Sequence, residues 1–248
     1  MYWLGAPFRF LYKLYFGFVY ILSGIILYPY FLIALSGSKK YQRAVKVKKI
    51  WARTICVLTF IKVKIINQHK FPKEGPYIVV ANHASYLDII VMYRVIPHDF
   101  AFLGKAEVLK WPIINVFFKR GIDIPVYRNS RKKAAQSIKA AHDAVSEGRC
   151  IAIFPEGKMQ DNPPTLERFK NGAFTIALDK NVPIVPITFI NNYKLFSEHT
   201  DFFGAGRPGV AKVNIHDTIV IEAQSDLVSL RNLTFHTIKG ELRIWQQN

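Results

Sequence analysis

The chain has 248 residues, which is enough to bury a full hydrophobic core as one domain. Its formal net charge of +17 indicates an anionic partner: a nucleic acid, an anionic membrane or an acidic protein. Half of the residues are hydrophobic and 14% are aromatic, which excludes a disordered nucleic-acid-binding tail.

The first predicted element is an apolar segment, residues 14–38, that contains no charged residue. It is long enough to cross a bilayer, which needs about 20 apolar residues, and too long for the core of a signal peptide. Pro29 should kink or break a helix there. Two geometries remain open: a tilted spanning helix, and a broken helix or helical hairpin that enters one leaflet. Tyrosines typical of a membrane interface are Tyr12, Tyr15, Tyr20, Tyr28 and Tyr30.

Basic residues are concentrated after this segment, since only Arg9 and Lys13 precede it closely. The basic residues that follow are Lys39, Lys40, Arg43, Lys46, Lys48, Lys49 and Arg53. By the positive-inside rule the rest of the chain is cytoplasmic, and each basic residue near an anionic leaflet contributes about 1 kcal/mol. We therefore predict an anchor in residues 1–40 and, in residues 41–248, a domain on the cytoplasmic face of the cell membrane. The alternative for the basic residues is an ordinary solvated helix face.

From about residue 54, strand-like and helix-like segments alternate. The expected strands are residues 63–67, 77–82, 100–105, 123–127, 150–154 and 182–190, followed by a pair at 211–215 and 218–222. The expected helices are residues 85–94, 129–147, 172–180 and 225–245. This order predicts an α/β fold with a mixed, largely parallel central sheet flanked by helices.

Two cysteines, Cys56 and Cys150, are too few and too far apart for a disulfide framework or a zinc site. Cys150 opens an apolar run, so we expect a buried thiol and a reducing compartment.

The sequence NHASYLD, residues 82–88, lies where a buried strand gives way to a helix. Ser85 and Asp88 have the spacing of a capping box, which explains Asp88 by local structure alone. His83 and Asp88 on one helix would point about 140° apart. They can meet if His83 lies in the turn and Asp88 in the first helical turn. Asp88 would then orient one ring nitrogen and leave the other to take a proton, and capping is compatible with this role.

No G-x-S-x-G sequence and no Walker A motif accompany this pair. Without an obvious protein nucleophile, the economical mechanism has His83 deprotonate a substrate hydroxyl, which attacks an activated acyl group directly.

Two further motifs follow expected strands. The FPEGK turn, residues 154–158, has backbone amides that can hold an anion, with Glu156 at the same edge and Lys158 adding charge. Arg128 follows the strand at 123–127, where ligands collect in α/β sheets, and arginine binds phosphate bidentately. A plain strand-ending turn and a solvated arginine are the alternatives.

In order and spacing, these motifs resemble the glycerolipid acyltransferase family, the 1-acylglycerol-3-phosphate acyltransferases typified by bacterial PlsC. The matching blocks are residues 83–88, 121–128, 154–157, 169–174 and 182–187. The resemblance implies that His83 is the general base and Asp88 its partner. It also implies that Arg128, Glu156 and Gly157 hold the phosphate of the acceptor and shape the site. Lys105 stands where the family often has a lysine.

One departure concerns the residues after FPEG, which are Lys-Met-Gln where the family often has Thr-Arg-Ser. Lys158 supplies a charge one position early, as a point charge instead of a fork, and Lys170 could assist. The acceptor therefore stays open between a phosphate-bearing lysolipid and a lyso-aminolipid of the ornithine or glycine type. The isolated histidines His142, His199 and His216 are expected to be structural or solvated.

The sequence thus predicts an acyltransferase that acylates a lysophospholipid, in the first place 1-acylglycerol 3-phosphate, to give phosphatidic acid. The expected partners are an anionic leaflet, the lysolipid acceptor, and an acyl thioester of coenzyme A or acyl carrier protein. No metal, no further cofactor and no nucleic acid are expected. A membrane-binding module without catalysis is the alternative from another class.

Overall fold

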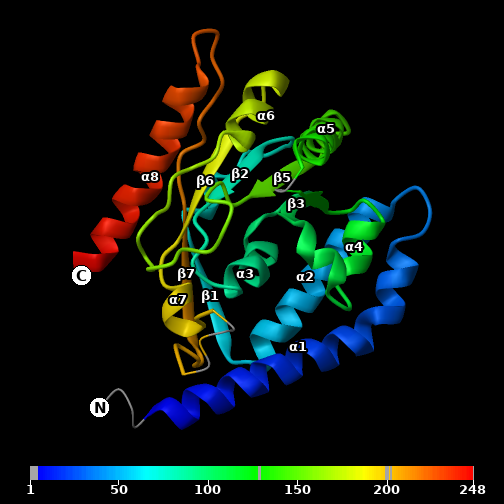
Figure 1. Ribbon diagram of the computed structural model, residues 1–248, viewed down its shortest axis with the longest axis vertical. Helices are drawn as coiled ribbons and strands as arrows, with labels where there is room; N and C mark the ends of the chain where they lie inside the picture. Colours follow the sequence, from blue (N-terminus) through cyan, green and yellow to red (C-terminus); the bar gives the residue numbers. More distant parts are fainter. Residues whose placement is uncertain (1–4, 128–129, 199–200, 202, 248) are drawn as a thin grey trace.

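A single mixed sheet forms the centre of the protein. The computed structural model describes residues 5–127, 130–198, 201 and 203–247. In this part of the chain, seven strands follow the order β1-β7-β6-β2-β5-β3-β4 (Figure 1). They are β1 (Ile61–Ile66), β2 (Ile78–Ala81), β3 (Phe100–Lys105), β4 (Ile124–Val126), β5 (Cys150–Ile153), β6 (Ile184–Phe189) and β7 (Gly209–Ile215). The pair β6 and β7 is antiparallel and the other pairs are parallel, which confirms the predicted sheet.

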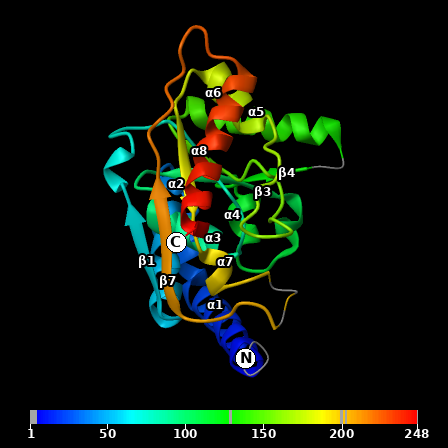
Figure 2. The ribbon, with the colours of Figure 1, turned by 90° about the vertical axis from the view of Figure 1, so that its left-hand side faces the viewer.

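Helices cover both faces of the sheet. One face carries α1 (Ala6–Ala34), α2 (Lys40–Leu58) and α3 (Leu87–Val95), and the other carries α5 (Arg131–Ser146), α6 (Gly172–Lys180) and α8 (Leu227–Gln247) (Figures 1 and 2). The short helices α4 (Asn115–Lys119) and α7 (Asn192–Leu195), with the 3₁₀ turns η2 (Gln68–Lys70) and η3 (Ala106–Lys110), complete the described elements.

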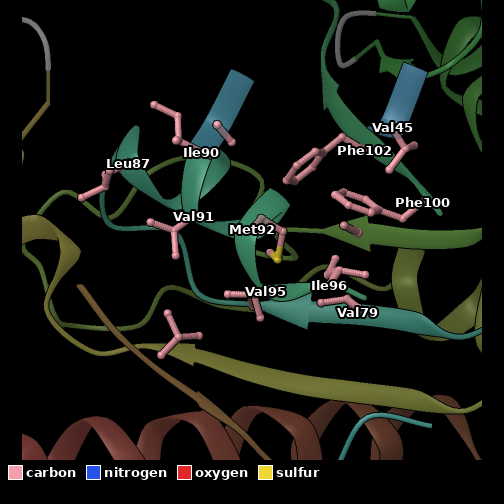
Figure 3. Close-up of a cluster of buried hydrophobic side chains, with 14 of the residues drawn as sticks. Val45, Val79, Leu87, Ile90, Val91, Met92, Val95, Ile96, Phe100 and Phe102 are labelled. Carbon is pink, nitrogen blue, oxygen red and sulfur yellow. The ribbon is translucent and has the colours of Figure 1, made fainter. Parts of the chain in front are cut away.

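Strand β2 shows why two faces must be covered. Val79 belongs to the apolar cluster under α2 and α3, whereas Ile78 and Val80 belong to the cluster under α5, α6 and α8. Successive side chains of a strand point to opposite faces, so an all-apolar strand needs helices on both. Figure 3 shows the first cluster, in which Val91 and Met92 of α3 pack against strands β2 and β3.

The predicted strand at residues 218–222 is wrong. Strand β7 already has β1 on one side and β6 on the other, so no edge of β7 is left for a further partner. Ile219 makes only an isolated antiparallel bridge with Ile184.

Of the predicted kink or break at Pro29, the break is wrong, because α1 continues through this residue from Ala6 to Ala34. Packing just beyond the proline offsets the lost backbone hydrogen bond. The Phe31 side chain is fully buried, with its ring 5.3 Å from that of Trp51 and 5.0 Å from that of Phe117, measured between centroids.

The apolar helix α1 lies on the domain along its length (Figure 1). Near its middle, the indole of Trp51 in α2 donates a 2.9 Å hydrogen bond to Ser23 Oγ. A Cβ atom at Gly24 would lie 2.9 Å from Ile113 Cδ1, so glycine permits the close approach there. The opposite face of α1 exposes large apolar side chains, namely Phe8, Leu11, Leu14, Phe18, Ile21, Ile25, Ile26 and Ile33.

A buried ion pair fixes α2 to the sheet. Lys48 Nζ lies 2.9 and 2.7 Å from the two carboxylate oxygens of Asp123, which also accepts the backbone N–H of Phe102 at 3.0 Å. The ammonium lies 4.9 Å from the ring centroids of Tyr93 and Phe117. Burial lowers the pKa of Lys48, and Asp123 opposes that shift. The pair joins α2 to the residue just before β4.

Breaking this pair should cost stability. Lys48→Ala leaves Asp123 buried without its cation, so the free energy of unfolding should fall by about 3–5 kcal/mol. Urea denaturation in detergent solution measures the change. Lys46→Ala, at an exposed position of the same helix, is the matched control and should stay within about 0.5 kcal/mol of the unmodified protein. Equal losses for the two variants would contradict the assignment.

Candidate active site

The site is built where β2 leaves the sheet. Asn82, which is fully buried, fixes that point by pairing with the backbone of Phe189 in β6. Its amide donates to the Phe189 carbonyl at 3.0 Å, and its oxygen accepts the Phe189 N–H at 2.8 Å. The next residue, His83, therefore starts its turn from a fixed position at the carboxyl end of a central strand, where α/β proteins place ligand sites.

His83 and Asp88 are in contact, as the turn-then-helix geometry predicts. The distance from His83 Nδ1 to Asp88 Oδ2 is 3.0 Å. A carboxylate can only accept a hydrogen bond, so Nδ1 is the donor and Nε2 is the nitrogen that can take a proton. The imidazole side chain is 13% exposed, whereas that of Asp88 is 0% exposed. The arrangement is that of an oriented general base.

Asp88 also holds the turn that precedes α3. Its Oδ2 accepts the backbone N–H groups of Ala84 and Ser85, each at 2.8 Å. Its Oδ1 accepts the side-chain amide of Asn192 at 2.8 Å. One carboxylate thus orients His83 and holds the turn before α3, while the hydroxyl of Ser85 accepts the N–H of Leu87, the first residue of the helix.

The FPEG turn packs directly on the His83 ring. Phe154 stacks against it, with ring centroids 4.1 Å apart and planes inclined by 11°. Glu156 Oε1 accepts the backbone N–H of His83 at 2.8 Å, and Oε2 accepts that of Glu167 at 2.8 Å. Glu156 therefore ties the turn after β5 to the turn after β2. Burial raises the pKa of Glu156 to about 7, although these donors oppose the shift.

Gly157 and the neighbouring lysines form the outer part of this turn. Gly157 has a φ of +74°, and a Cβ there would lie 2.9 Å from Lys170 Nζ. Glycine therefore lets the exposed Lys170 side chain lie against the turn. Lys158 is 44% exposed and its ammonium contacts the carboxylates of Asp161 and Glu167. Two acidic neighbours thus pair with the Lys158 ammonium, which the sequence analysis assigned to phosphate binding.

The remaining predicted residues lie elsewhere or outside the described residues. Lys105 is exposed at the end of β3, opposite Val126 of β4. Arg128 and His199 lie outside the described residues. His142 Nε2 is 3.5 Å from an Asp179 oxygen, and His216 Nε2 is 2.7 Å from Thr188 Oγ1. No described contact joins Lys105 to His83.

The sequence did not predict the contact of Asn192 with Asp88, or the backbone N–H groups that Glu156 accepts. Asn191 and Asn192 follow the buried strand β6 after a single residue, and polar residues at that place are a signal for a site. The pairing of Asn192 with Asp88 spans 104 residues, which no local pattern shows. Among the described residues, no group of three or more His, Cys, Asp or Glu side chains is placed to hold a metal ion.

The sequence of this chain is similar to that of a known protein family. Residues 62–190, more than half of the chain, match the family described as Acyltransferase. The chain belongs to the acyltransferase family. The matched segment contains β2, His83, Asp88 and the FPEG turn.

Individual relatives extend this acyltransferase assignment. A chloroplast 1-acyl-sn-glycerol-3-phosphate acyltransferase of Brassica napus is 27% identical over 83% of this chain, and the match covers 60% of that protein. A 1-acyl-sn-glycerol-3-phosphate acyltransferase of Borreliella burgdorferi is 30% identical, and the match covers 58% of each chain. The crystal structure of PlsC from Thermotoga maritima shares the fold, with a TM-score of 0.78 and 22% identity, over 100% of this chain and 99% of that one.

The raised pKa of Glu156 predicts a pH-dependent stability. The pKa in the folded protein, about 7, exceeds the usual glutamate pKa of 4.5, so folding is favoured by protonation. This contribution is complete below pH 4.5 and is lost as the pH rises through 7. Between those limits the free energy of unfolding should fall by about 1–3 kcal/mol more in the unmodified protein than in Glu156→Gln.

Urea midpoints of the two proteins between pH 4.5 and pH 8 measure this difference. Parallel curves for the two proteins would contradict the assignment.

Proposed function

We propose that this protein transfers a fatty acyl group from an acyl thioester to the free hydroxyl of a lysophospholipid, 1-acylglycerol 3-phosphate, to give phosphatidic acid. The observation that carries the proposal is the 3.0 Å contact from His83 Nδ1 to a buried Asp88, which leaves Nε2 for proton transfer. The names of the relatives support the same reaction.

In the proposed reaction, Nε2 of His83 removes the proton of the acceptor hydroxyl as its oxygen attacks the thioester carbonyl. A carbon–oxygen bond forms and the carbon–sulfur bond breaks. The leaving thiolate then takes the proton from His83, so the enzyme returns to its starting state. Asp88 stabilises the charged imidazole between these steps. The acyl group passes directly between the substrates, from a thioester of coenzyme A or acyl carrier protein.

The phosphate-bearing acceptor is supported by charge. A net charge of +17 attracts both an anionic lysolipid and an anionic leaflet. Lys170 lies against Gly157 in the turn that contacts His83, so a cation stands close to the proposed reaction centre. A lyso-aminolipid remains the second candidate, because the two acidic neighbours of Lys158 weaken the cationic character of the same turn.

The exposed face of α1 supports a position at the membrane, and the basic residues that follow the helix support a catalytic domain on the cytoplasmic side. The helix has 29 residues and is long and apolar enough to cross a bilayer. However, its other face is held by the domain at three positions along its length, through Phe16, Ser23 and Phe31. A helix held in this way suits a position in the plane of one leaflet, with residues 1–40 acting as the anchor.

Removal of the base should abolish most of the rate. His83→Ala should lower kcat about 10²- to 10⁴-fold, because proton transfer in the transition state is lost. Asp88→Asn should also lower kcat, because an amide can donate to Nδ1 and so favour the wrong tautomer. Acyl transfer by purified protein in mixed micelles is the measurement. His142→Ala is the matched histidine control and should retain full activity; an active His83→Ala variant would end the assignment of the base.

The acceptor can be decided by direct competition. Purified protein is given one acyl thioester with 1-acylglycerol 3-phosphate and a lyso-ornithine lipid in the same micelles, and products are separated by mass. We expect kcat/KM to favour the phosphate acceptor, because the cationic surface raises its local concentration. This preference should weaken at high salt. Preferred turnover of the aminolipid at every salt concentration would replace the phosphate acceptor with the second candidate.

A further inference from the structure

Asn192, the first residue of α7, is fully buried and makes one side-chain hydrogen bond within the described residues. Its Nδ2 donates to Asp88 Oδ1 at 2.8 Å. Its Oδ1 is buried and has no hydrogen-bond partner among the described residues. A buried polar atom without a partner is unfavourable, so native proteins keep one where another requirement outweighs the cost. Here the requirement is a donor for the second oxygen of Asp88.

The neighbouring Asn191 shows that this contact is not needed to attach α7 to the sheet. Its amide donates to the Val210 carbonyl at 2.9 Å, and its oxygen accepts the N–H of Lys212 at 2.8 Å. Both bonds go to the backbone of β7, so Asn191 holds α7 against the sheet. Asn192 instead directs its donor to Asp88 alone.

The two oxygens of Asp88 are therefore held from different parts of the chain. Oδ2 accepts His83 Nδ1 and the N–H groups of Ala84 and Ser85, all within the same turn. Oδ1 accepts only Asn192 among the described residues. Without that donor the carboxylate can rotate about its Cβ–Cγ bond and exchange the oxygen that faces His83. The orientation of the imidazole then becomes less well defined.

Resting on the proposed function, we propose that Asn192 is a positioning residue that fixes the Asp88 carboxylate and, through it, the reactive orientation of His83. It touches neither substrate in this proposal. Its removal should therefore act on kcat and leave KM nearly unchanged, because the acceptor and the thioester bind to other groups.

The decisive experiment compares Asn192→Leu with the same substitution at Asn191. Leucine matches asparagine in size and removes the donor. Asn192→Leu should lower kcat about 10- to 100-fold, as expected for loss of a hydrogen bond to a charged group, with KM within about two-fold. Asn191→Leu should retain kcat within about three-fold even where it lowers the melting temperature. Equal kcat values for the unmodified protein and a folded Asn192→Leu variant would overturn the proposal.

A double-mutant cycle tests whether Asn192 acts through Asp88. In the Asp88→Asn background, Asn192→Leu should cause little further loss of kcat, because the carboxylate that it positions is already gone. Losses that multiply fully would show an independent role and would overturn the proposal. If Asn192→Leu does not fold, Asn192→Ser and Asn192→Ala replace it. The serine variant, which keeps a donor, should be the faster of the two, and equal rates would count against the proposal.

A readout without turnover separates this inference from the proposed function. In ¹⁵N-labelled protein, the Nδ1–H proton of His83 is identified by its loss in His83→Ala. Its signal should persist in Asn191→Leu and should broaden by exchange in Asn192→Leu. If the unmodified protein transfers no acyl group to any acceptor, the proposed function fails, and this signal alone decides the role of Asn192. An unchanged signal in Asn192→Leu would overturn that role.

Discussion

The buried carboxylate of Asp88 is the interaction on which the site depends. It has no exposed surface, so its charge needs hydrogen-bond donors from the protein. Four donors reach it: His83 Nδ1, two backbone N–H groups and the amide of Asn192. One group therefore fixes the turn between β2 and α3 and orients the imidazole. A single carboxylate joins the fold to the chemistry, which is why the NHASYLD sequence reads equally well as a cap and as a catalytic pair.

The same turn is connected to the apolar helix α1. Ser85 donates its hydroxyl to the carbonyl of Phe196, and the ring of Phe196 lies 4.4 Å from that of Phe16 in α1, between centroids. Lys13, one helical turn before Phe16, donates to Ser197 Oγ at 2.7 Å. The segment after α7 thus contacts both the turn that carries His83 and the proposed anchor.

Much of the fold could be predicted because strands β2, β5 and β6 are continuous apolar runs with clear ends. The strand at 218–222 could not be excluded from the sequence. Its alternating apolar pattern is visible locally, whereas the occupation of both edges of β7 by β1 and β6 depends on contacts distant in sequence. The continuity of α1 at Pro29 depends on the burial of Phe31, which no rule for proline contains. In the site, the five-residue spacing of His83 and Asp88 was sufficient, since the turn geometry is local. Asn192 required a contact across 104 residues.

Glu156 has a structural role in the turn that follows β5. Each carboxylate oxygen accepts a backbone N–H, one from His83 and one from Glu167. A carboxylate beside a phosphate would repel it, whereas a carboxyl group that joins two turns needs no ligand. Burial raises the pKa of Glu156 to about 7. The backbone groups that it accepts belong to the turns around His83, where Phe154 stacks on the imidazole. The FPEG turn therefore contributes shape through Glu156, and among the described residues Lys170, which lies on Gly157, supplies cationic charge at this turn.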